Sequence, residues 1–237
     1  MALPVIPQIT YELTIPSTKQ KVKYRPFLVK EQKDLLIAQQ SDDENVMIET
    51  LKNIIRQCTL GKIDVNKLAM FDIEYIFTQL RAKSVGEYSE LTFNCLECND
   101  PKAKMNVTID LTTLKVDIDE THKSIIPLFD NIGIKMKYPG LSLFDKMKKL
   151  EGNEVDMIFD VIIECIDSIY DEETSYPAHE QSREDLETFI NNLTQDQFQK
   201  VQKFFETMPK LEKQIEFDCP MCKYHHQHTI RGLSGFF

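Results

Sequence analysis

Two cysteine pairs with the same two-residue spacer are the side chains of this sequence best suited to chemistry. They are Cys95-Leu96-Glu97-Cys98 and Cys219-Pro220-Met221-Cys222. A two-residue spacer lets both thiolates of a pair point at one tetrahedral ion, with zinc–sulfur bonds of about 2.3 Å. We therefore predict one Zn²⁺ site whose ligands are Cys95, Cys98, Cys219 and Cys222.

The predicted site is structural, because four protein ligands complete a tetrahedral zinc and leave no position for water or substrate. The pairs are separated by residues 99–218, far more than the roughly 15–20 residues usual between the halves of such a site. A redox dithiol, or cysteines that are unliganded or crosslinked, are therefore alternatives. His225, His226 and His228 follow the second pair closely. One of them could replace a cysteine as ligand; otherwise they lie on the surface or beside the ligands.

Apolar and polar residues alternate around each cysteine pair, which is typical of strands. Leu91 and Phe93 precede the first pair, and Ile215 and Phe217 precede the second. Each pair is therefore predicted at the tip of a β-hairpin. Two such hairpins facing each other would form a zinc ribbon, split here by a large insertion.

The rest of the chain is expected to be mainly helical. Alternation over residues 9–15 and 22–27 predicts an N-terminal β-hairpin, apolar stripes predict three helices before residue 86, and a strand is expected over 134–138. Residues 141–208 are predicted to be helical, apart from an acidic loop over 171–177. The stripe that supports this comprises Val155, Ile158, Phe159, Ile162, Ile166 and Ile169.

The sequence also predicts roles for the two remaining cysteines and for the last two residues. Cys58 and Cys165 lie on apolar helical stripes and are expected to be small buried hydrophobic residues. Phe236 and Phe237 are expected either to pack against the chain's own ribbon or to dock on a partner.

The predicted fold class is α+β, predominantly helical, with an N-terminal β-hairpin and a split zinc ribbon. The predicted domains are 1–88 (hairpin and helices), 89–118 with 212–237 (the split ribbon) and 119–211 (a mainly helical insertion). Together they are expected to form one compact unit.

The amino-acid composition indicates which kinds of partner the chain is expected to bind. The chain has 237 residues, of which 42% are hydrophobic, so it can bury a sizeable core. Its net charge of −10 disfavours nucleic-acid binding, which depends on neutralising phosphates. The N-terminus has no basic leader, and no stretch approaches the ~20 apolar residues of a membrane helix. We expect a soluble intracellular protein that binds neither nucleic acid nor membrane.

No constellation typical of an enzyme stands out. The sequence has only 7 glycines and no phosphate-binding loop, and it has no Gly-x-Ser-x-Gly motif. His122 and His179 lie in polar stretches and are expected to be exposed bystanders. The chain is therefore predicted not to be an enzyme.

Four stretches, taken in order, resemble a known family. They are Tyr24 to Leu36, Asp72 to Glu87, Tyr138-Pro139, and Leu193 to Leu211 leading to the second cysteine pair. Together they are similar to the baseplate hub assembly proteins of T-even-like contractile-tailed bacteriophages.

The resemblance implies a late phage protein of the host cell cytoplasm, or of the virion baseplate itself. It would act on phage baseplate hub proteins, either as a chaperone-like assembly factor or as a minor baseplate component. It offers no catalytic residues. The alternative function is a zinc-ribbon adaptor that binds host or phage transcription machinery. The sequence does not indicate an oligomeric state.

Overall fold

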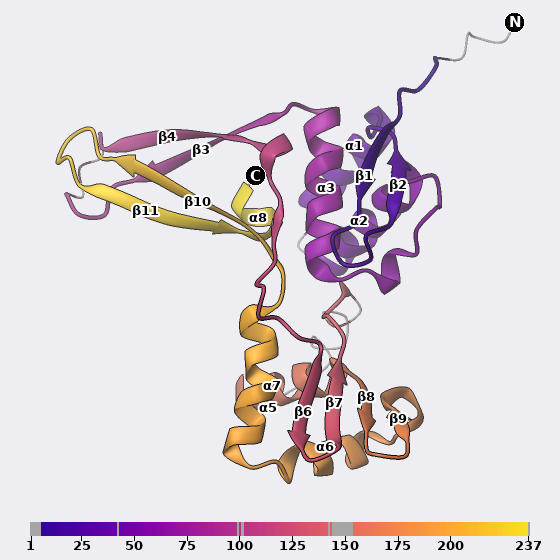
Figure 1. The fold of residues 1–237 in the computed structure, drawn as a ribbon. Helices are drawn as coiled ribbons and strands as arrows, with labels where there is room; N and C mark the ends of the chain where they lie inside the picture. The colour runs from indigo at the N-terminus through magenta and orange to yellow at the C-terminus, as the bar shows by residue number, and fades with distance from the viewer. Residues whose placement is uncertain are drawn as a thin grey trace, which may run out of the picture. The chain divides into compact units, whose positions relative to one another are not determined.

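The computed structural model describes residues 6–41, 43–98, 100, 102–141, 143 and 154–236, and the chain divides into two units (Figure 1). Unit 1 is Met1–Asp117 with Lys210–Phe237, and unit 2 is Ile118–Pro209. Both cysteine pairs therefore belong to unit 1.

Unit 1 begins with a two-stranded hairpin that packs on three helices. Strands β1 (Tyr11–Thr14) and β2 (Lys21–Tyr24) pair antiparallel, with Leu13 opposite Val22. Both of these side chains are buried, as alternation predicts for the inner face of a hairpin. The helices are α1 (Val29–Gln39), α2 (Glu44–Cys58) and α3 (Met70–Ser84).

Two buried acidic residues tie this hairpin to the helices. Asp72, fully buried at the start of α3, accepts hydrogen bonds from the Ser17 backbone and hydroxyl in the hairpin turn. Glu31 on α1 pairs with Arg25, which follows β2, at 2.7 Å between Oε1 and Nη2. Both side chains of this pair are buried, at 1% and 7% exposed. Burial raises the pKa of Glu31, but hydrogen bonds from Arg25 and the Leu28 amide outweigh it, so the pKa lies below its usual value.

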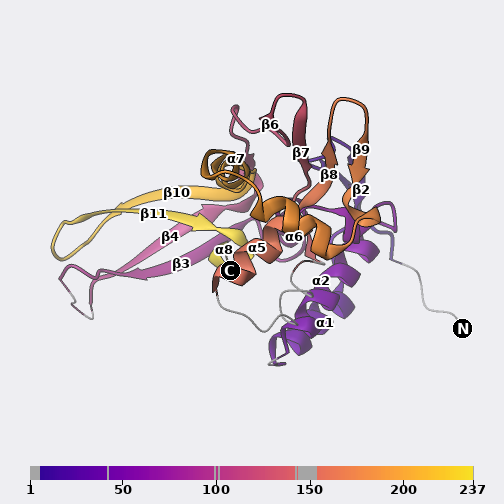
Figure 2. The ribbon, with the colours of Figure 1, turned by 90° about the horizontal axis from the view of Figure 1, so that it is seen from below.

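Two long hairpins complete unit 1 and carry the cysteines at their tips. Strands β3 (Tyr88–Asn94) and β4 (Lys104–Asp110) form one hairpin. Strands β10 (Lys210–Asp218) and β11 (His225–Arg231) form the other, and the short β5 (Val116–Asp117) pairs with the start of β10. The hairpins extend side by side from α3 (Figures 1 and 2). The chain ends in α8 (Gly232–Phe236), which packs against α3 and β11.

A small apolar cluster anchors the base of both hairpins to α3. It comprises Ala82, Ile109, Leu111, Leu114, Leu211, Ile215 and Ile230. Because these residues come from α3, from the end of β4 and from β10–β11, the cluster fixes where each hairpin leaves the body of unit 1.

Unit 2 is a four-stranded antiparallel sheet covered by helices. The strands, in spatial order, are β6 (Ile125–Phe129), β7 (Ile132–Met136), β8 (Ile166–Tyr170) and β9 (Ser175–Pro177). The helices are α5 (Glu154–Glu164), α6 (Arg183–Asn191) and α7 (Gln195–Thr207). The predicted capping box is present, because the Thr194 hydroxyl accepts from the Gln197 amide and the Gln197 side chain accepts from the Thr194 amide.

The prediction of a predominantly helical chain is wrong, because the part of the chain that the structure describes is 40% helical and 27% strand. Part of the error lies in residues 166–170, where the apolar stripe of α5 continues into β8, and β6 and β9 add strands to the insertion that was expected to be mainly helical. Ile166 and Ile169 pair with Met136 and Ile134 of β7, so tertiary pairing overrides the helical spacing. β-Branched isoleucine favours a strand where such a partner exists.

The predicted zinc-ribbon fold is not established either. The two cysteine hairpins belong to separate sheets, one of two strands and one of three, rather than to one ribbon. What the structure does show is four neighbouring cysteines at the tips of these hairpins.

Some predictions fall outside the described residues. Residues 144–153 of the stretch predicted to be helical are not described, and neither are the side chains of Phe236 and Phe237. Across the described parts of the chain, no helix has the length and apolar character needed to cross a bilayer.

The buried ion pair gives a stability prediction. Arg25→Met leaves the Glu31 carboxylate buried without its main partner, so the free energy of unfolding should fall by about 3 kcal/mol at pH 7. The pKa of Glu31 is lower in the folded protein than in the unfolded chain. The ionised Glu31 side chain therefore adds to the free energy of unfolding at neutral pH, and this addition is lost as the pH falls below about 4. The difference between variant and wild type, measured by urea unfolding, should therefore shrink in acid.

A matched control is Lys21→Met, which removes an exposed pair between Lys21 and Glu12 whose side chains are 73% and 51% exposed. Its effect should stay under about 1 kcal/mol. Equal effects of the two substitutions would contradict a special role for the buried pair.

Candidate metal centre

The four predicted ligands lie together. The sulfur atoms of Cys95, Cys98, Cys219 and Cys222 are all within 4.8 Å of one another. Across the two hairpins, the sulfurs of Cys95 and Cys222 are 3.7 Å apart and those of Cys98 and Cys219 are 3.9 Å apart. Four ligands at about 2.3 Å around a tetrahedral ion would place their sulfurs about 3.8 Å apart. The arrangement could therefore hold a metal ion of this kind.

Local backbone hydrogen bonds shape each cysteine turn. In the first turn, the Cys95 amide donates to the Ala103 carbonyl at 3.0 Å, which closes the end of the β3–β4 hairpin. In the second, the Cys219 amide donates to the Tyr224 carbonyl at 2.9 Å. Lys223 takes a left-handed conformation with φ of 61°, which lets the chain reverse directly after Cys222.

The site is covered unevenly. Cys95 and Cys219 are buried, Cys98 is half-buried and Cys222 is exposed. Ala103 and Met105 pack beside the two buried thiols, and the rings of Phe93 and Phe217 lie 5.0 Å apart between the hairpins. The two hairpins thus contact each other through apolar side chains beside the sulfur cluster.

A backbone amide also favours the thiolate form of Cys219. The amide of Cys222 lies 3.5 Å from the Cys219 sulfur and is the main cause that lowers the pKa of Cys219 to about 7. For Cys222, the Tyr224 amide lowers the pKa, but desolvation and the neighbouring thiols outweigh it and raise the pKa to about 12. The Cys219 thiol therefore loses its proton more readily than the Cys222 thiol, and a bound cation would take the place of the thiol protons.

The other two cysteines belong to the hydrophobic core, as predicted. Cys58 is 0% exposed and Cys165 is 1% exposed. Burial raises the pKa of Cys58 to about 11 and that of Cys165 to about 12. Both remain protonated at neutral pH and are poor nucleophiles and metal ligands.

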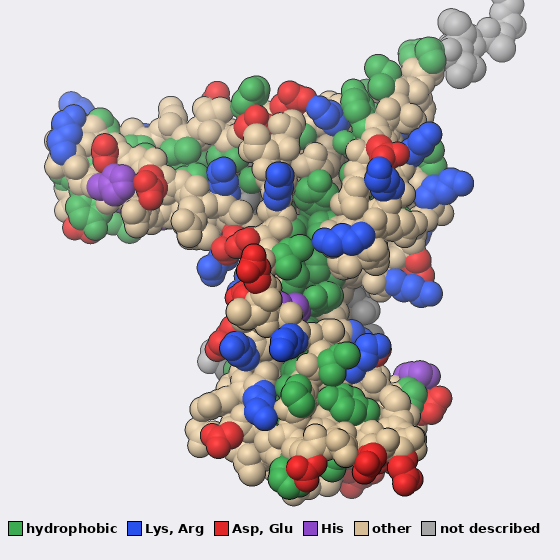
Figure 3. All heavy atoms as spheres, in the orientation of Figure 1, with side chains coloured by type: hydrophobic (Ala, Val, Ile, Leu, Met, Phe, Trp, Pro, Cys, Tyr) green, Lys and Arg blue, Asp and Glu red, His purple; other side chains and the backbone are tan. Residues whose placement is uncertain are grey.

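The three histidines after the second pair differ in their burial and contacts. Figure 3 shows histidine and acidic side chains at the end of the paired hairpins, where His225 is exposed and pairs with Asp218 at 2.8 Å. His226 is buried, with its Nε2 atom 3.3 Å from the Cys95 sulfur. Alternation along β11 separates His225 from His226 and His228, which share a face and stack on each other, so the sequence alone does not distinguish His226 from His228.

His122 is not the exposed bystander that the sequence suggested. Its ring is half-buried in unit 2, with its centroid 5.0 Å from that of Phe204 and 5.5 Å from that of Tyr138, and Nδ1 is 3.0 Å from the Thr207 hydroxyl. Desolvation lowers its pKa, so the ring is neutral and serves to pack the loop before β6.

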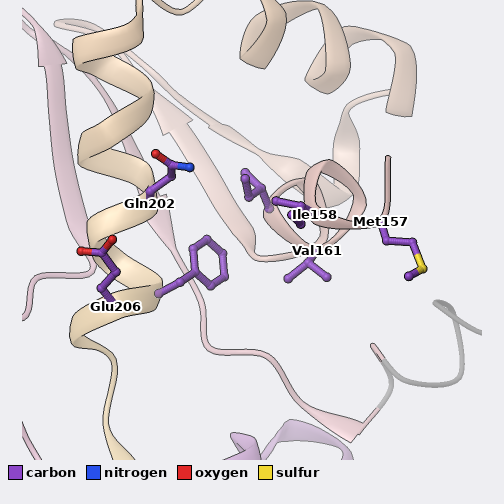
Figure 4. Close-up of a pocket in the computed structure, with 7 residues that line it drawn as sticks. Met157, Ile158, Val161, Gln202 and Glu206 are labelled. Atoms are coloured by element: carbon purple, nitrogen blue, oxygen red, sulfur yellow. The ribbon is translucent and has the colours of Figure 1, made fainter. Parts of the chain in front are cut away.

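An apolar hollow lies in unit 2 between α5 and α7 (Figure 4). It has a volume of about 570 Å³ and is lined by Met157, Ile158, Val161, Ile162, Gln202, Phe205 and Glu206. The lining is mostly apolar, which suits hydrophobic contact. These lining residues offer neither a nucleophile with an adjacent base nor a cluster of metal ligands.

Comparison with known proteins now places the chain. A family model described as "T4 bacteriophage base plate protein" matches residues 6–237, so the chain belongs to this family. A curated relative, "Baseplate hub assembly protein gp26" of Enterobacteria phage T4, is 25% identical over 228 residues, which is 96% of this chain and 97% of that protein. No solved structure gives a significant match. The family resemblance predicted from the sequence is confirmed.

The cluster geometry gives a prediction for ligand loss. With metal present, Cys98→Ser and Cys219→Ser should each lower the melting temperature by about 10 °C. A tightly bound ion adds about 4 kcal/mol at a thousandfold excess over its Kd, and each kcal/mol corresponds to roughly 2–4 °C in a domain of this size. The measurement is thermal unfolding followed by circular dichroism, with and without a strong chelator.

Leu96→Ser is the matched control, because Leu96 lies between two of the ligands and is 82% exposed. It should melt like wild type. Chelation should remove most of the difference between wild type and the cysteine variants. If the variants instead melt like wild type with metal present, the cysteines do not stabilise the fold through a metal.

Proposed function

We propose that this chain is an assembly factor for the central hub of a contractile phage tail baseplate. The observation that carries the proposal is the match to the relative named baseplate hub assembly protein, which covers 96% of this chain and 97% of that protein. A match over nearly the full length of both chains includes both units and both cysteine hairpins. It therefore supports a shared role for the whole chain rather than a shared module.

The protein would act by binding other baseplate proteins rather than by catalysis. Its partners would be phage baseplate hub proteins, met in the host cell cytoplasm while the baseplate is built. An acidic net charge of −10 suits a factor that must stay free between rounds of binding. The apolar hollow between α5 and α7 is compatible with protein contact.

The proposal includes one structural Zn²⁺ ion held by Cys95, Cys98, Cys219 and Cys222. Cross-hairpin sulfur distances of 3.7 and 3.9 Å support it, because they are close to the spacing that zinc requires. A soft four-thiolate set favours zinc over magnesium or calcium, which prefer oxygen ligands. The ion would crosslink the two hairpins and have no position left for substrate.

The metal prediction is tested by composition. Protein purified without a polyhistidine tag should contain about one zinc per chain by elemental analysis. X-ray absorption should show four sulfur ligands at about 2.3 Å. Absence of metal, together with four freely titratable thiols in the folded protein, would overturn the zinc site.

The assembly role is tested in infected cells. A tagged chain should capture baseplate hub proteins, identified by mass spectrometry, and its loss should stop hub formation. Completed tails should lack the protein if it is an assembly factor. A fixed copy number in finished tails would instead make it a baseplate component, and capture of RNA polymerase subunits without hub proteins would contradict a baseplate role.

A further inference from the structure

His226 lies in one cysteine hairpin, and the sulfur nearest to its ring belongs to a cysteine of the other hairpin. It lies on β11, whereas Cys95 directly follows β3 in the other hairpin. The distance from Nε2 to the Cys95 sulfur is 3.3 Å, within hydrogen-bond range for sulfur, and both side chains are buried, at 8% and 3% exposed. No other side chain of the three-histidine group has a described contact with a cysteine sulfur.

Contacts with two aromatic rings restrain the orientation of the His226 ring. His226 stands opposite Phe217 in the β10–β11 register, and the two rings stack with centroids 5.4 Å apart. Tyr224 meets the ring edge-on, with centroids 4.8 Å apart and an interplanar angle of 70°. An imidazole that contacts two aromatic rings in this way has little freedom to turn away from the sulfur.

The imidazole stands beside the four-sulfur group and does not belong to it. The four sulfurs lie within 4.8 Å of one another, and no nitrogen of His226 belongs to that group. A thiolate has lone pairs but no proton, so a favourable contact at 3.3 Å requires the Nε2 atom to donate its proton. Hydrogen bonds of this kind hold ligands in place and lessen the charge that builds up on a site of four thiolates and one dication.

We propose that His226 is a positioning residue of the metal centre, which donates its Nε2–H to the Cys95 thiolate. It stabilises the charged form of that ligand and fastens the β10–β11 hairpin to the end of β3. This inference rests on the zinc site proposed above, and it assigns His226 a role beyond the four ligands.

Three variants of the full-length protein separate hydrogen bonding from packing. His226→Phe keeps a ring in the stack but removes the donor. His228→Phe is the matched control, because His228 stacks on the same Phe217 ring at 5.4 Å and has no described sulfur contact. His226→Gln keeps a hydrogen-bond donor but removes the ring. It also tests the loss of the ring if His226→Phe does not fold.

The readout is the rate at which zinc passes from the loaded protein to an excess of a chromogenic chelator. Loss of such a partner typically costs about 10- to 100-fold in metal affinity, so His226→Phe should release zinc about 10- to 100-fold faster. His228→Phe should stay within about twofold of wild type, and His226→Gln should lie between the two. X-ray absorption should give four sulfur ligands in every variant.

Two results would overturn the inference. One is equal release rates for wild type, His226→Phe and His226→Gln. The other is a nitrogen ligand in the wild-type spectrum that disappears in His226→Phe, because His226 would then bind the ion itself. Failure of the zinc site is distinguishable from both, since wild type would then contain no metal before any variant is compared.

Discussion

The structure of unit 1 depends on closing one long loop. Residues 95–98 and 219–222 must meet although residues 99–218 lie between them, and bringing the ends of such a loop together costs conformational entropy. Two features offset this cost within unit 1. β5 pairs with β10 where the chain leaves and re-enters the unit, with Leu211 opposite Val116. At the far ends of the hairpins the same two parts of the chain meet again, where the four cysteine sulfurs lie within 4.8 Å of one another.

Local patterns were sufficient to predict the parts of the fold that are governed by short-range rules. The three helices before residue 86, the N-terminal hairpin and the capping box at Thr194 all follow from periodicity and from cap chemistry. The two-residue spacer likewise fixes the geometry within each cysteine pair, whereas the meeting of the two pairs was predicted from the four ligands that a zinc ion takes and not from a local rule. Whether the two units behave as the one compact unit expected from the sequence stays a prediction.

Features that depend on distant partners could not be read from the sequence. Ile166 and Ile169 fit a helical stripe equally well, and only their pairing with β7 makes them a strand. His226 was one of three neighbouring histidines, and the fold selects it because β11 turns that face toward Phe217 and Cys95. In both cases the residue type allowed two outcomes, and the contact made across the chain decided between them.

The stretches that carry the family resemblance now have a physical meaning. The first contains the buried Arg25–Glu31 pair, and the second contains Asp72, which holds the hairpin turn, and Ser84, whose hydroxyl accepts from the Phe27 amide at 2.9 Å. A buried polar group without its partner destabilises the fold, so such groups restrict the sequence far more than exposed ones do. The described polar contacts of these two stretches therefore belong to the internal frame of unit 1, and they do not indicate where a partner binds.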